Sequence, residues 1–364
     1  MTATVRRYVA LTDGFLDDVH HAKTAYGVLR YGRDDVVAIV DRKFAGRRLQ
    51  DVVPGIGRDA PVVATIGEAL AFAPTSLLIG VAVSGGALPP VFRAHVLAAI
   101  DAGLEIVNGL HQFMADDPEF AAHARASGAR LWDVREPPDD IPLMSGAAYG
   151  VPQTVVLAVG SDCAVGKMSV MLELTAAAQA DDARAEFVAT GQTGIMIAGS
   201  GICVDRVISD FVSGAAEQLV TSVASDAAFI FVEGQGSIIH PAFAAVTYGL
   251  MFGSAPDLLV LCHDVERKLI GDGEFDVPIP DLPALARLYE TTLAPIKAAP
   301  CVAVALNTRV LSSAQAQAHI HQVQAQTGLP TDDVVRFGGG KLWHAINAAS
   351  HRTGKRLAGT ATHT

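Results

Sequence analysis

Apolar residues in the first part of the chain form short β-branched runs that alternate with amphipathic stretches. Runs with strand character lie at residues 7–11, 36–40, 62–65, 76–80 and 105–108. Stretches with helical character lie between or after them, at residues 20–31, 88–102 and 118–127. Strands and helices that alternate at this spacing are typical of a parallel, doubly wound sheet. The pattern therefore predicts an α/β fold for this half.

A second series of the same kind begins at Thr154 with the run T-V-V-L-A-V-G. Strand-like runs follow at residues 184–190, 227–233, 258–262 and 302–307, with a helical stretch at residues 170–180. Residues 135–152, which include R-E-P-P-D-D-I-P, are rich in proline and turn formers and are typical of a linker. We therefore predict two parallel α/β domains, at residues 1–150 and 151–364.

The composition of the chain argues against several classes of protein. Its 364 residues carry a formal net charge of −11, whereas a nucleic-acid-binding surface requires clustered positive charge. Glycine, proline or a charged residue interrupts each apolar stretch before it is long enough to span a bilayer. The four cysteines are far apart in the sequence, which is typical of reduced cytosolic thiols. We expect a cytoplasmic protein with no membrane partner, and the high apolar content favours a homodimer or larger homo-oligomer.

A glycine-rich turn follows the first strand of the second half. Residues 160–169 read G-S-D-C-A-V-G-K-M-S and lie between an apolar strand and a helical run, as in phosphate-binding loops. In such a loop, backbone N–H groups converge on one anion, Gly166 lets the backbone approach it and Lys167 adds a positive charge. The alternative is a tight turn whose lysine is solvated. The residues expected to bind the cofactor are Gly160, Ser161, Cys163, Ala164, Val165, Gly166, Lys167, Met168 and Ser169.

Two residues of this turn depart from the standard nucleotide-binding loop. Ser161 stands where the loop has its first glycine, and Met168 stands where a hydroxyl normally holds the Mg²⁺ of a nucleoside triphosphate. A thioether does not replace that hydroxyl on a hard cation, and Ser169 lies about 100° further round the helix. The loop therefore predicts a phosphate-bearing ligand that is held without hydrolysis.

Polar side chains also follow the other predicted strands of the second half. Because the carboxyl ends of parallel strands meet at one edge of a sheet, we expect these side chains to converge on the glycine loop. The candidate catalytic residues are Glu233, His240 and Asp264. The candidate substrate-binding residues of this half are Thr193, Asp205, Arg206, Gln235, Asn307 and Arg309.

Roles for these candidates follow from their chemistry. A carboxylate or an imidazole suits proton transfer, which makes Glu233 or His240 the expected base, and guanidinium groups suit the capture of carboxylates. The alternatives are that Glu233 caps a following helix and that His240 is structural. Three consecutive residues cannot all face one point on a strand, so Cys262 is assigned to the core and His263 or Asp264 stays a weaker candidate.

The first half carries fewer chemical motifs. A strand ends in Thr12-Asp13-Gly14, but the G-x-G-x-x-G fingerprint of dinucleotide binding is absent. His20 and His21 have no acidic or cysteine partner at metal-ligand spacing, so we expect no metal there. Lys23 and Arg30 are seven residues apart and share one helix face, where we expect them to contact the substrate.

Several of these motifs occur together in one known family. The ordered set H-A-K-T-A-Y-G-V-L-R-Y, G-S-D-C-A-V-G-K-M-S, A-T-G-Q-T-G, V-E-G-Q-G-S-I-I-H-P and A-L-N-T resembles, across almost the whole chain, a former domain-of-unknown-function family. Its members have a Rossmann-like N-terminal part and a P-loop C-terminal part and are assigned as D-glutamate N-acetyltransferases of the DgcN type. The resemblance implies a Rossmann-like domain followed by a P-loop NTPase-like domain.

The resemblance also implies an activity, which is the transfer of an acetyl group from acetyl-CoA to the amine of D-glutamate or a related amino acid. The expected co-substrate is acetyl-CoA, whose phosphates a glycine loop and Lys167 suit without any hydrolysis. The second half alone resembles dethiobiotin synthetase, from which Met168 departs. An ATP- and Mg²⁺-dependent ligase or kinase is therefore the alternative, and a non-catalytic nucleotide-binding protein is a third.

Overall fold

The computed structural model describes residues 5–352, which form two compact units. The first unit extends to Glu136 and also contains the insert Gln192–Cys203. The second unit contains Pro137–Gly191 and continues from Val204. The insert therefore belongs to the second half of the sequence but to the first unit of the structure.

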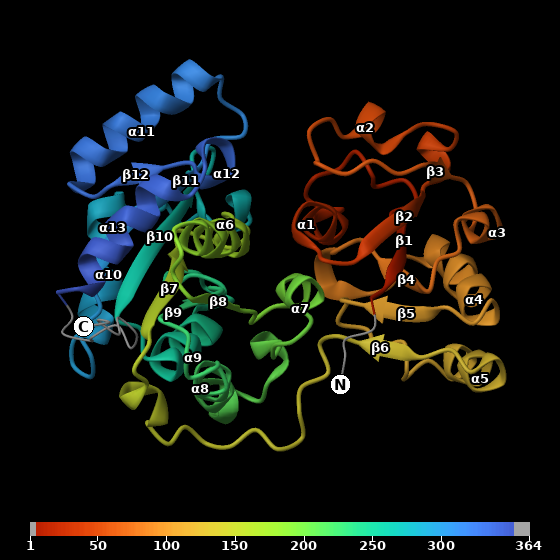
Figure 1. Cartoon of the computed structure of the whole chain (residues 1–364), viewed down its shortest axis with the longest axis horizontal. Coiled ribbons are helices and arrows are strands. Elements are labelled where there is room, and N and C mark those ends of the chain that lie inside the picture. The colour runs from red at the N-terminus through yellow and green to blue at the C-terminus, as the bar shows by residue number, and fades with distance from the viewer. Residues whose placement is uncertain (1–4, 353–364) are drawn as a thin grey trace, which may run out of the picture. The chain divides into compact units, whose positions relative to one another are not determined.

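The first unit contains a six-stranded parallel sheet with the strand order β3-β2-β1-β4-β5-β6 (Figure 1). Its strands are β1 (Arg7–Leu11), β2 (Asp35–Val40), β3 (Val62–Val63), β4 (Ser76–Ile79), β5 (Glu105–Asn108) and β6 (Leu131–Asp133). Its helices are α1 (Lys23–Tyr31), α2 (Leu49–Val52), α3 (Ile66–Ala69), α4 (Arg93–Asp101), α5 (Pro118–Ser127) and, from the insert, α7 (Gln192–Ala198). The predicted strands and the parallel sheet are confirmed, and β6 is an addition.

Two helix starts in this unit differ from the predicted ones. The helix predicted at residues 20–31 begins at Lys23, because the Asp18 carboxylate accepts hydrogen bonds from the backbone N–H groups of His20 and His21 and closes a turn there. The helix predicted at residues 88–102 begins at Arg93. Prolines at positions 89 and 90 have no N–H to donate, and only a 3-10 turn, Pro90–Phe92, precedes the helix.

The second unit contains another six-stranded parallel sheet, with the strand order β12-β11-β10-β7-β9-β8 (Figure 1). Its strands are β7 (Thr154–Gly160), β8 (Ala185–Val188), β9 (Phe229–Val232), β10 (Leu258–Asp264), β11 (Cys301–Asn307) and β12 (Thr331–Asp332). Its helices are α6 (Lys167–Ala180), α8 (Val212–Thr221), α9 (Ala244–Ser254), α10 (Leu282–Leu293), α11 (Ser313–Thr327), α12 (Val334–Phe337) and α13 (Gly340–Ser350).

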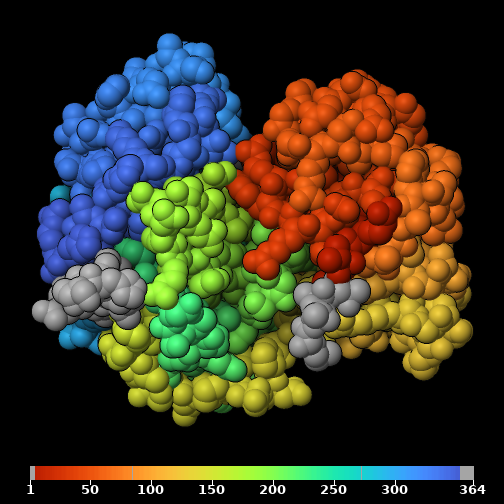
Figure 2. Space-filling view, viewed as in Figure 1, coloured from red at the N-terminus to blue at the C-terminus, as the bar shows by residue number. Residues whose placement is uncertain are grey.

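The core of the second unit explains why its strands are apolar throughout. All seven residues of β7 are buried, as expected for a parallel strand covered on both faces. On one face, side chains of α6, α12 and α13 pack against the sheet, and Trp343 meets the ring of Phe229 edge-on at 4.8 Å. The blue C-terminal helices form much of the visible surface of this unit in Figure 2.

Several details of the second half were not predicted correctly or were missed, and the helices α8 to α13 are among those missed. Helix α6 begins at Lys167, earlier than the predicted residue 170, so the lysine is the first helical residue. The short strand β12 was not predicted. No helix was predicted at residues 192–198, where the structure has α7, whose Ile195, Met196 and Ile197 are buried. Among residues 5–352, every helix is too short or too polar to cross a bilayer.

Candidate functional site

The glycine loop of the second unit connects the central strand β7 to α6. The helix begins directly after Gly166, whose φ of 101° is in the left-handed region that favours glycine. Ala164 also has a positive φ, of 54°. This sharp turn points the N–H groups of the first turn of α6 into the loop, which is the geometry of an anion-binding site.

Lys167 lies inside this loop and is buried, with 6% of its surface exposed. Its Nζ donates a hydrogen bond to the backbone oxygen of Asp162 at 2.7 Å. A Cβ on Gly160 would lie 2.8 Å from that Nζ, and a Cβ on Gly234 would lie 2.9 Å from the lysine Cδ. The side chain therefore occupies a slot that two glycines leave open. Burial lowers the pKa of Lys167, and the alternative of a merely solvated lysine is excluded.

Glu233 follows β9 and is held by the end of the neighbouring strand. Its Oε2 accepts hydrogen bonds from the backbone N–H groups of Thr190 and Gly191, at 2.9 and 3.1 Å. The Thr190 hydroxyl donates to the backbone oxygen of Glu233 at 2.8 Å. The carboxylate binds these strand-end amides, and α9 begins only at Ala244, so Glu233 does not cap the following helix.

The environment of Glu233 raises the pKa of its carboxyl group towards neutral pH. The side chain is 5% exposed, and burial raises the pKa of this carboxyl to about 7. The two backbone donors and the positive charge of Lys167 act in the opposite direction, whereas the charge of Asp205 raises the pKa further. A carboxyl group with a pKa near 7 can accept or give a proton at physiological pH.

Asp162 ties the glycine loop to the segment that follows β10. Its Oδ1 accepts from the backbone N–H of Cys163 at 2.7 Å, and its Oδ2 accepts from the N–H of Gly271 at 2.9 Å. The Arg267 guanidinium lies 3.6 Å from Oδ2. Asp162 was not among the predicted site residues, although an acidic residue inside a phosphate-binding loop is an unusual feature that the sequence displays.

His240 lies beside Asp162 and is 1% exposed. Its Nε2 is 3.8 Å from the Oδ1 of Asp162, and its Nδ1 accepts a hydrogen bond from the backbone N–H of Ala242 at 3.1 Å. With Nδ1 as an acceptor, the neutral ring carries its proton on Nε2. This arrangement favours His240 as a hydrogen-bond donor and leaves Glu233 as the better candidate for the base.

Asp162, Cys163 and His240 also bring three possible metal-ligand atoms within 4.8 Å of one another. Both carboxylate oxygens of Asp162 already accept backbone N–H groups, and the His240 nitrogen nearest to it carries the ring proton. A metal ion would have to displace these hydrogen bonds. The three groups fit a hydrogen-bonded cluster better than a set of metal ligands.

Tyr289 of α10 binds the end of β7 by hydrogen bonds and was not predicted from the sequence. Its hydroxyl donates to the backbone oxygen of Gly160 at 2.7 Å and accepts from the N–H of Ile238 at 3.2 Å. The residue is fully buried. One tyrosine in an amphipathic helix carries no motif, so only the structure reveals this contact.

The remaining candidates of β10 and β11 form a network that Ser161 links to the loop. Asn307 donates to the Oδ2 of Asp264 at 2.7 Å, and the exposed Arg309 lies 3.3 Å from Glu266. Ser161 in the loop is 2.8 Å from the Nδ1 of His263. Cys262 is fully buried, and burial raises the pKa of its thiol to about 12, which confirms its assignment to the core.

The other predicted residues divide between the two units. Gln235 donates to the hydroxyl of Thr190 at 3.3 Å, and Asp205 and Arg206 are exposed on the 3-10 turn Val204–Arg206 of the second unit. Thr193 belongs to the first unit, where its hydroxyl donates to that of Thr24 at 3.4 Å. Lys23 and Arg30 are exposed on α1.

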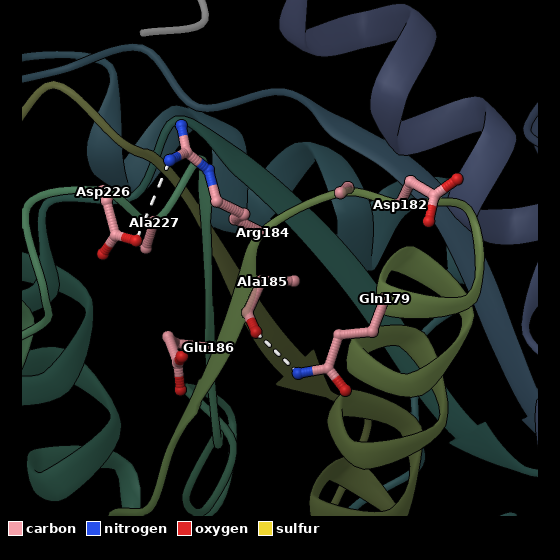
Figure 3. Close-up of a pocket in the computed structure, with 8 residues that line it drawn as sticks. Gln179, Asp182, Arg184, Ala185, Glu186, Asp226 and Ala227 are labelled. Carbon is pink, nitrogen blue, oxygen red and sulfur yellow. Dashed lines mark hydrogen bonds and ion pairs between the residues drawn. The ribbon is translucent and has the colours of Figure 1, made fainter. Parts of the chain in front are cut away.

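A cavity of about 370 Å³ lies at the opposite edge of the second sheet (Figure 3). It is lined by Gln179, Asp182, Ala183, Arg184, Ala185, Glu186, Asp226 and Ala227. These residues lie at the amino end of β8 and just before β9, whereas ligands of parallel sheets bind beyond the carboxyl ends of the strands. We therefore take the loop with Lys167 and Glu233 as the candidate site.

Comparisons with known proteins agree with this fold. Residues 42–137 match the domain of unknown function described as DUF1611_N, Rossmann-like domain, and residues 142–343 match DUF1611_C, P-loop domain. A crystal structure of a DUF1611 family protein from Anabaena variabilis has a TM-score of 0.89 and 40% sequence identity, and it covers 94% of this chain and 99% of that one.

Two curated relatives are named after an enzymatic activity. A protein of Tritonibacter scottomollicae named D-glutamate N-acetyltransferase is 35% identical over 341 residues, which are 92% of this chain and 97% of that protein. A protein of Pseudoalteromonas with the same name is 34% identical and covers 75% of this chain and 82% of its own length. With both domain matches in order and relatives aligned along almost its full length, the chain belongs to the DUF1611 family.

Proposed function

We propose that this protein transfers the acetyl group of acetyl-CoA to the α-amine of D-glutamate, the first step in the breakdown of that amino acid. The names of two relatives support the proposal, and so does the buried Glu233 beside Lys167. Acetyl transfer to an amine needs a base, because the amine must lose a proton as it attacks the thioester. Burial raises the pKa of Glu233 to about 7, which suits a base at neutral pH.

The glycine loop and Lys167 form an anion-binding site next to Glu233. The phosphates of acetyl-CoA are separated from its thioester by the long pantetheine arm. One anion-binding site therefore cannot bind both the diphosphate and the reacting carbonyl group. Because Lys167 and Glu233 interact electrostatically, we propose that this site binds the carbonyl oxygen, on which negative charge develops during the transfer. The diphosphate then lies outside the loop, and this assignment replaces the sequence-based expectation that the loop holds the phosphates of acetyl-CoA.

The acceptor carboxylates need a cationic partner. Arg206 is exposed on the same turn as Asp205, whose charge acts on Glu233, so this turn is near the base. We assign Arg206 to a carboxylate of the acceptor in this proposal.

The alternative of an ATP-dependent ligase is less favoured because of Met168. This residue lies in the first turn of α6, where a magnesium nucleotide site needs a hydroxyl oxygen. A thioether at that position argues for a reaction without nucleotide turnover.

One assay tests the function against the alternatives. The protein is incubated with acetyl-CoA and either D- or L-glutamate, and in parallel with Mg²⁺-ATP, while free thiol and phosphate are measured. We expect thiol release that depends on D-glutamate, together with N-acetylglutamate as the product. Phosphate release from ATP without thiol release would instead support the ligase, and neither signal would support a non-catalytic binding protein.

Location and assembly belong to the same proposal. The four cysteines lie within the described residues and form no disulfide bonds, which suits the reducing cytoplasm. Several large apolar side chains of the second unit are exposed, among them Ile208 at 74% and Phe243 at 50%, and we propose that the protein forms a homodimer or larger homo-oligomer. Light scattering after size exclusion measures the number of subunits directly.

A further inference from the structure

The thiol of Cys163 lies in the middle of the glycine loop, within a cluster of reactive groups. Its Sγ is within 4.8 Å of a carboxylate oxygen of Asp162 and of a ring nitrogen of His240. It also interacts electrostatically with Lys167. Cys163 is half-buried and the next residue, Ala164, is exposed, whereas Asp162, Lys167 and His240 are buried. Within this cluster, the thiol is the reactive group that solvent reaches.

We propose that Cys163 is a nucleophile that carries the acetyl group from the donor to the acceptor as an S-acetyl intermediate. This inference rests on the proposed acetyl transfer and adds a covalent step to it. The alternative within the same function is direct attack of the amine on acetyl-CoA, in which Cys163 only shapes the loop.

The surroundings of Cys163 differ from those of the other three cysteines. Cys203, Cys262 and Cys301 are buried, and burial raises the pKa of Cys262 and of Cys301 to about 12. Cys163 instead lies ahead of the N-terminus of α6, a helix of 14 residues, and near the positive charge of Lys167. A helix N-terminus and a neighbouring cation both stabilise a thiolate, which is the nucleophilic form of cysteine, whereas the nearby Asp162 carboxylate acts in the opposite direction.

The loop geometry holds this thiol in place. The backbone N–H of Cys163 donates to Asp162 at 2.7 Å, and Asp162 is itself held by Gly271 and Arg267. His240 presents its Nε2–H towards Asp162. The backbone that carries the thiol is therefore fixed before any substrate binds, as covalent catalysis requires.

The first half of the reaction consumes the donor. The Cys163 thiolate attacks the carbonyl carbon of acetyl-CoA, and a sulfur–carbon bond forms. The resulting oxyanion, which the loop amides stabilise, collapses and breaks the carbon–sulfur bond to CoA. CoA leaves as a thiolate and takes the proton that Lys167 holds after the ionisation of Cys163.

The second half regenerates the thiolate. The neutral amine of the acceptor attacks the S-acetyl carbonyl carbon, a carbon–nitrogen bond forms and the bond to Cys163 breaks. Glu233 takes the proton of the amine and returns it to Lys167, with which it interacts electrostatically. The sum is acetyl-CoA plus amine giving N-acetyl amine plus CoA, with no other reactant.

The test uses the full-length protein and acetyl-CoA without any acceptor. We expect the release of about one CoA per active site, and intact-protein mass spectrometry should then show one added acetyl group, which peptide mapping places on Cys163. Addition of D-glutamate should remove this group and yield N-acetylglutamate. Steady-state kinetics should give the parallel lines of a ping-pong mechanism.

Substitutions at position 163 separate a nucleophile from a structural residue. Cys163→Ala should lower kcat at least about a hundredfold and abolish the acetylated species. Cys163→Ser, which keeps the shape of the side chain, should remain nearly inactive, whereas a purely structural role predicts rescue by serine. Cys203→Ser is the matched control, and its acetylation should match that of the wild type.

Two results would overturn the covalent step. Cys163→Ala that keeps the wild-type kcat would exclude the nucleophile, and intersecting kinetic lines without any acetylated protein would favour direct attack. In both cases thiol release that depends on D-glutamate would persist, so the proposed function would stand. Wild-type protein that yields no N-acetylglutamate would contradict the function itself, and the covalent step with it.

Discussion

Opposing forces act on the Glu233 carboxylate. Burial disfavours its charged form, while two backbone N–H groups and Lys167 favour it. Burial has the larger effect, so the pKa of the carboxyl rises to about 7. The same balance would be hard to obtain on an exposed side chain, because water would screen both contributions.

The rate of the reaction should follow the ionisation of this residue. A base acts in its deprotonated form, so kcat/KM should rise with pH and level off above about pH 7. Glu233→Gln keeps the shape but cannot take a proton, and we expect it to lower kcat by a factor of about 10²–10⁴ and to remove this pH dependence. Glu186→Gln changes an exposed carboxylate on β8 and should leave the profile intact. An unaltered rate in Glu233→Gln would exclude Glu233 as the base.

The same carboxylate should make the folded state less stable at high pH. Its folded pKa, about 7, is above the ordinary value of 4.5, so the native protein binds more protons between these values and stability falls as pH rises through that window. At pH 8 the cost is up to about 3 kcal/mol. Glu233→Gln should therefore gain Tm relative to the wild type at pH 8 but not at pH 4. Thermal melts of both proteins at pH 4 and pH 8 measure the difference in Tm. An equal difference at the two pH values would contradict the prediction.

Sequence reasoning identified only some of the residues that build the site. The spacing of Gly166 and Lys167 after a strand predicts the loop, and the glycines around Glu233 mark a strand end. The contacts of Tyr289, Arg267 and Gly271 depend on segments distant in the sequence. The tautomer of His240 depends on one backbone N–H, that of Ala242. No local pattern encodes such contacts.

At the scale of elements, the site depends on close packing between β7 and the turn after β9. A Cβ on Gly234 would lie only 1.9 Å from the backbone oxygen of Ala158 and 2.9 Å from the Cδ of Lys167. The backbone of a central strand cannot move away without losing hydrogen bonds of the sheet.

Gly234→Ala should therefore be strongly destabilising, by about 3 kcal/mol or more, and should also displace Lys167. Gly340→Ala is the matched control. A Cβ there meets no atom within 4 Å and the residue begins α13, so the substitution should be neutral or slightly stabilising. Urea titrations of both variants give the comparison. Equal stabilities would show that the loop relaxes more easily than the structure implies.

Most strands were predicted from their apolar pattern, whereas most helices of the second half, including the 12-residue α10 and the 15-residue α11, were not. The strands of five or more residues, such as β1 and β7, and the helix α5 match the predicted ranges closely. The strands β6 and β12 have only three and two residues, which is too short for a periodic pattern. Helix α7 was not predicted because glycines follow it. Its buried residues also belong to the first unit, whereas the residues on either side of residues 192–203 belong to the second.

At the scale of the whole molecule, the insert makes the first unit discontinuous in sequence. Helix α7 packs on α1, and side chains of Gln192 and Met196 lie so close to Gly109 that a Cβ there would meet them at 2.9 Å. The first unit therefore completes its fold only after the chain has passed through β7 and β8.

A fragment that ends at Glu136 should consequently fold poorly. It lacks the buried Ile195, Met196 and Ile197, whose loss exposes apolar surface worth several kcal/mol. We expect a broad, weakly cooperative thermal transition and apolar dye binding, in contrast to the full chain. A fragment that carries residues 192–203 joined after Glu136 by a flexible linker is the control and should regain cooperativity. A sharp transition in the shorter fragment would contradict this expectation.

The junction at Gly191 has a consequence for Glu233. This residue is the last one before the insert, and its N–H is one of the two that hold the Glu233 carboxylate. The loss of a backbone donor raises the pKa of a carboxyl group, so a change that removes this hydrogen bond would raise the pKa of Glu233. One donor to the proposed base is therefore the last residue of its unit before the chain enters the segment that completes the first unit.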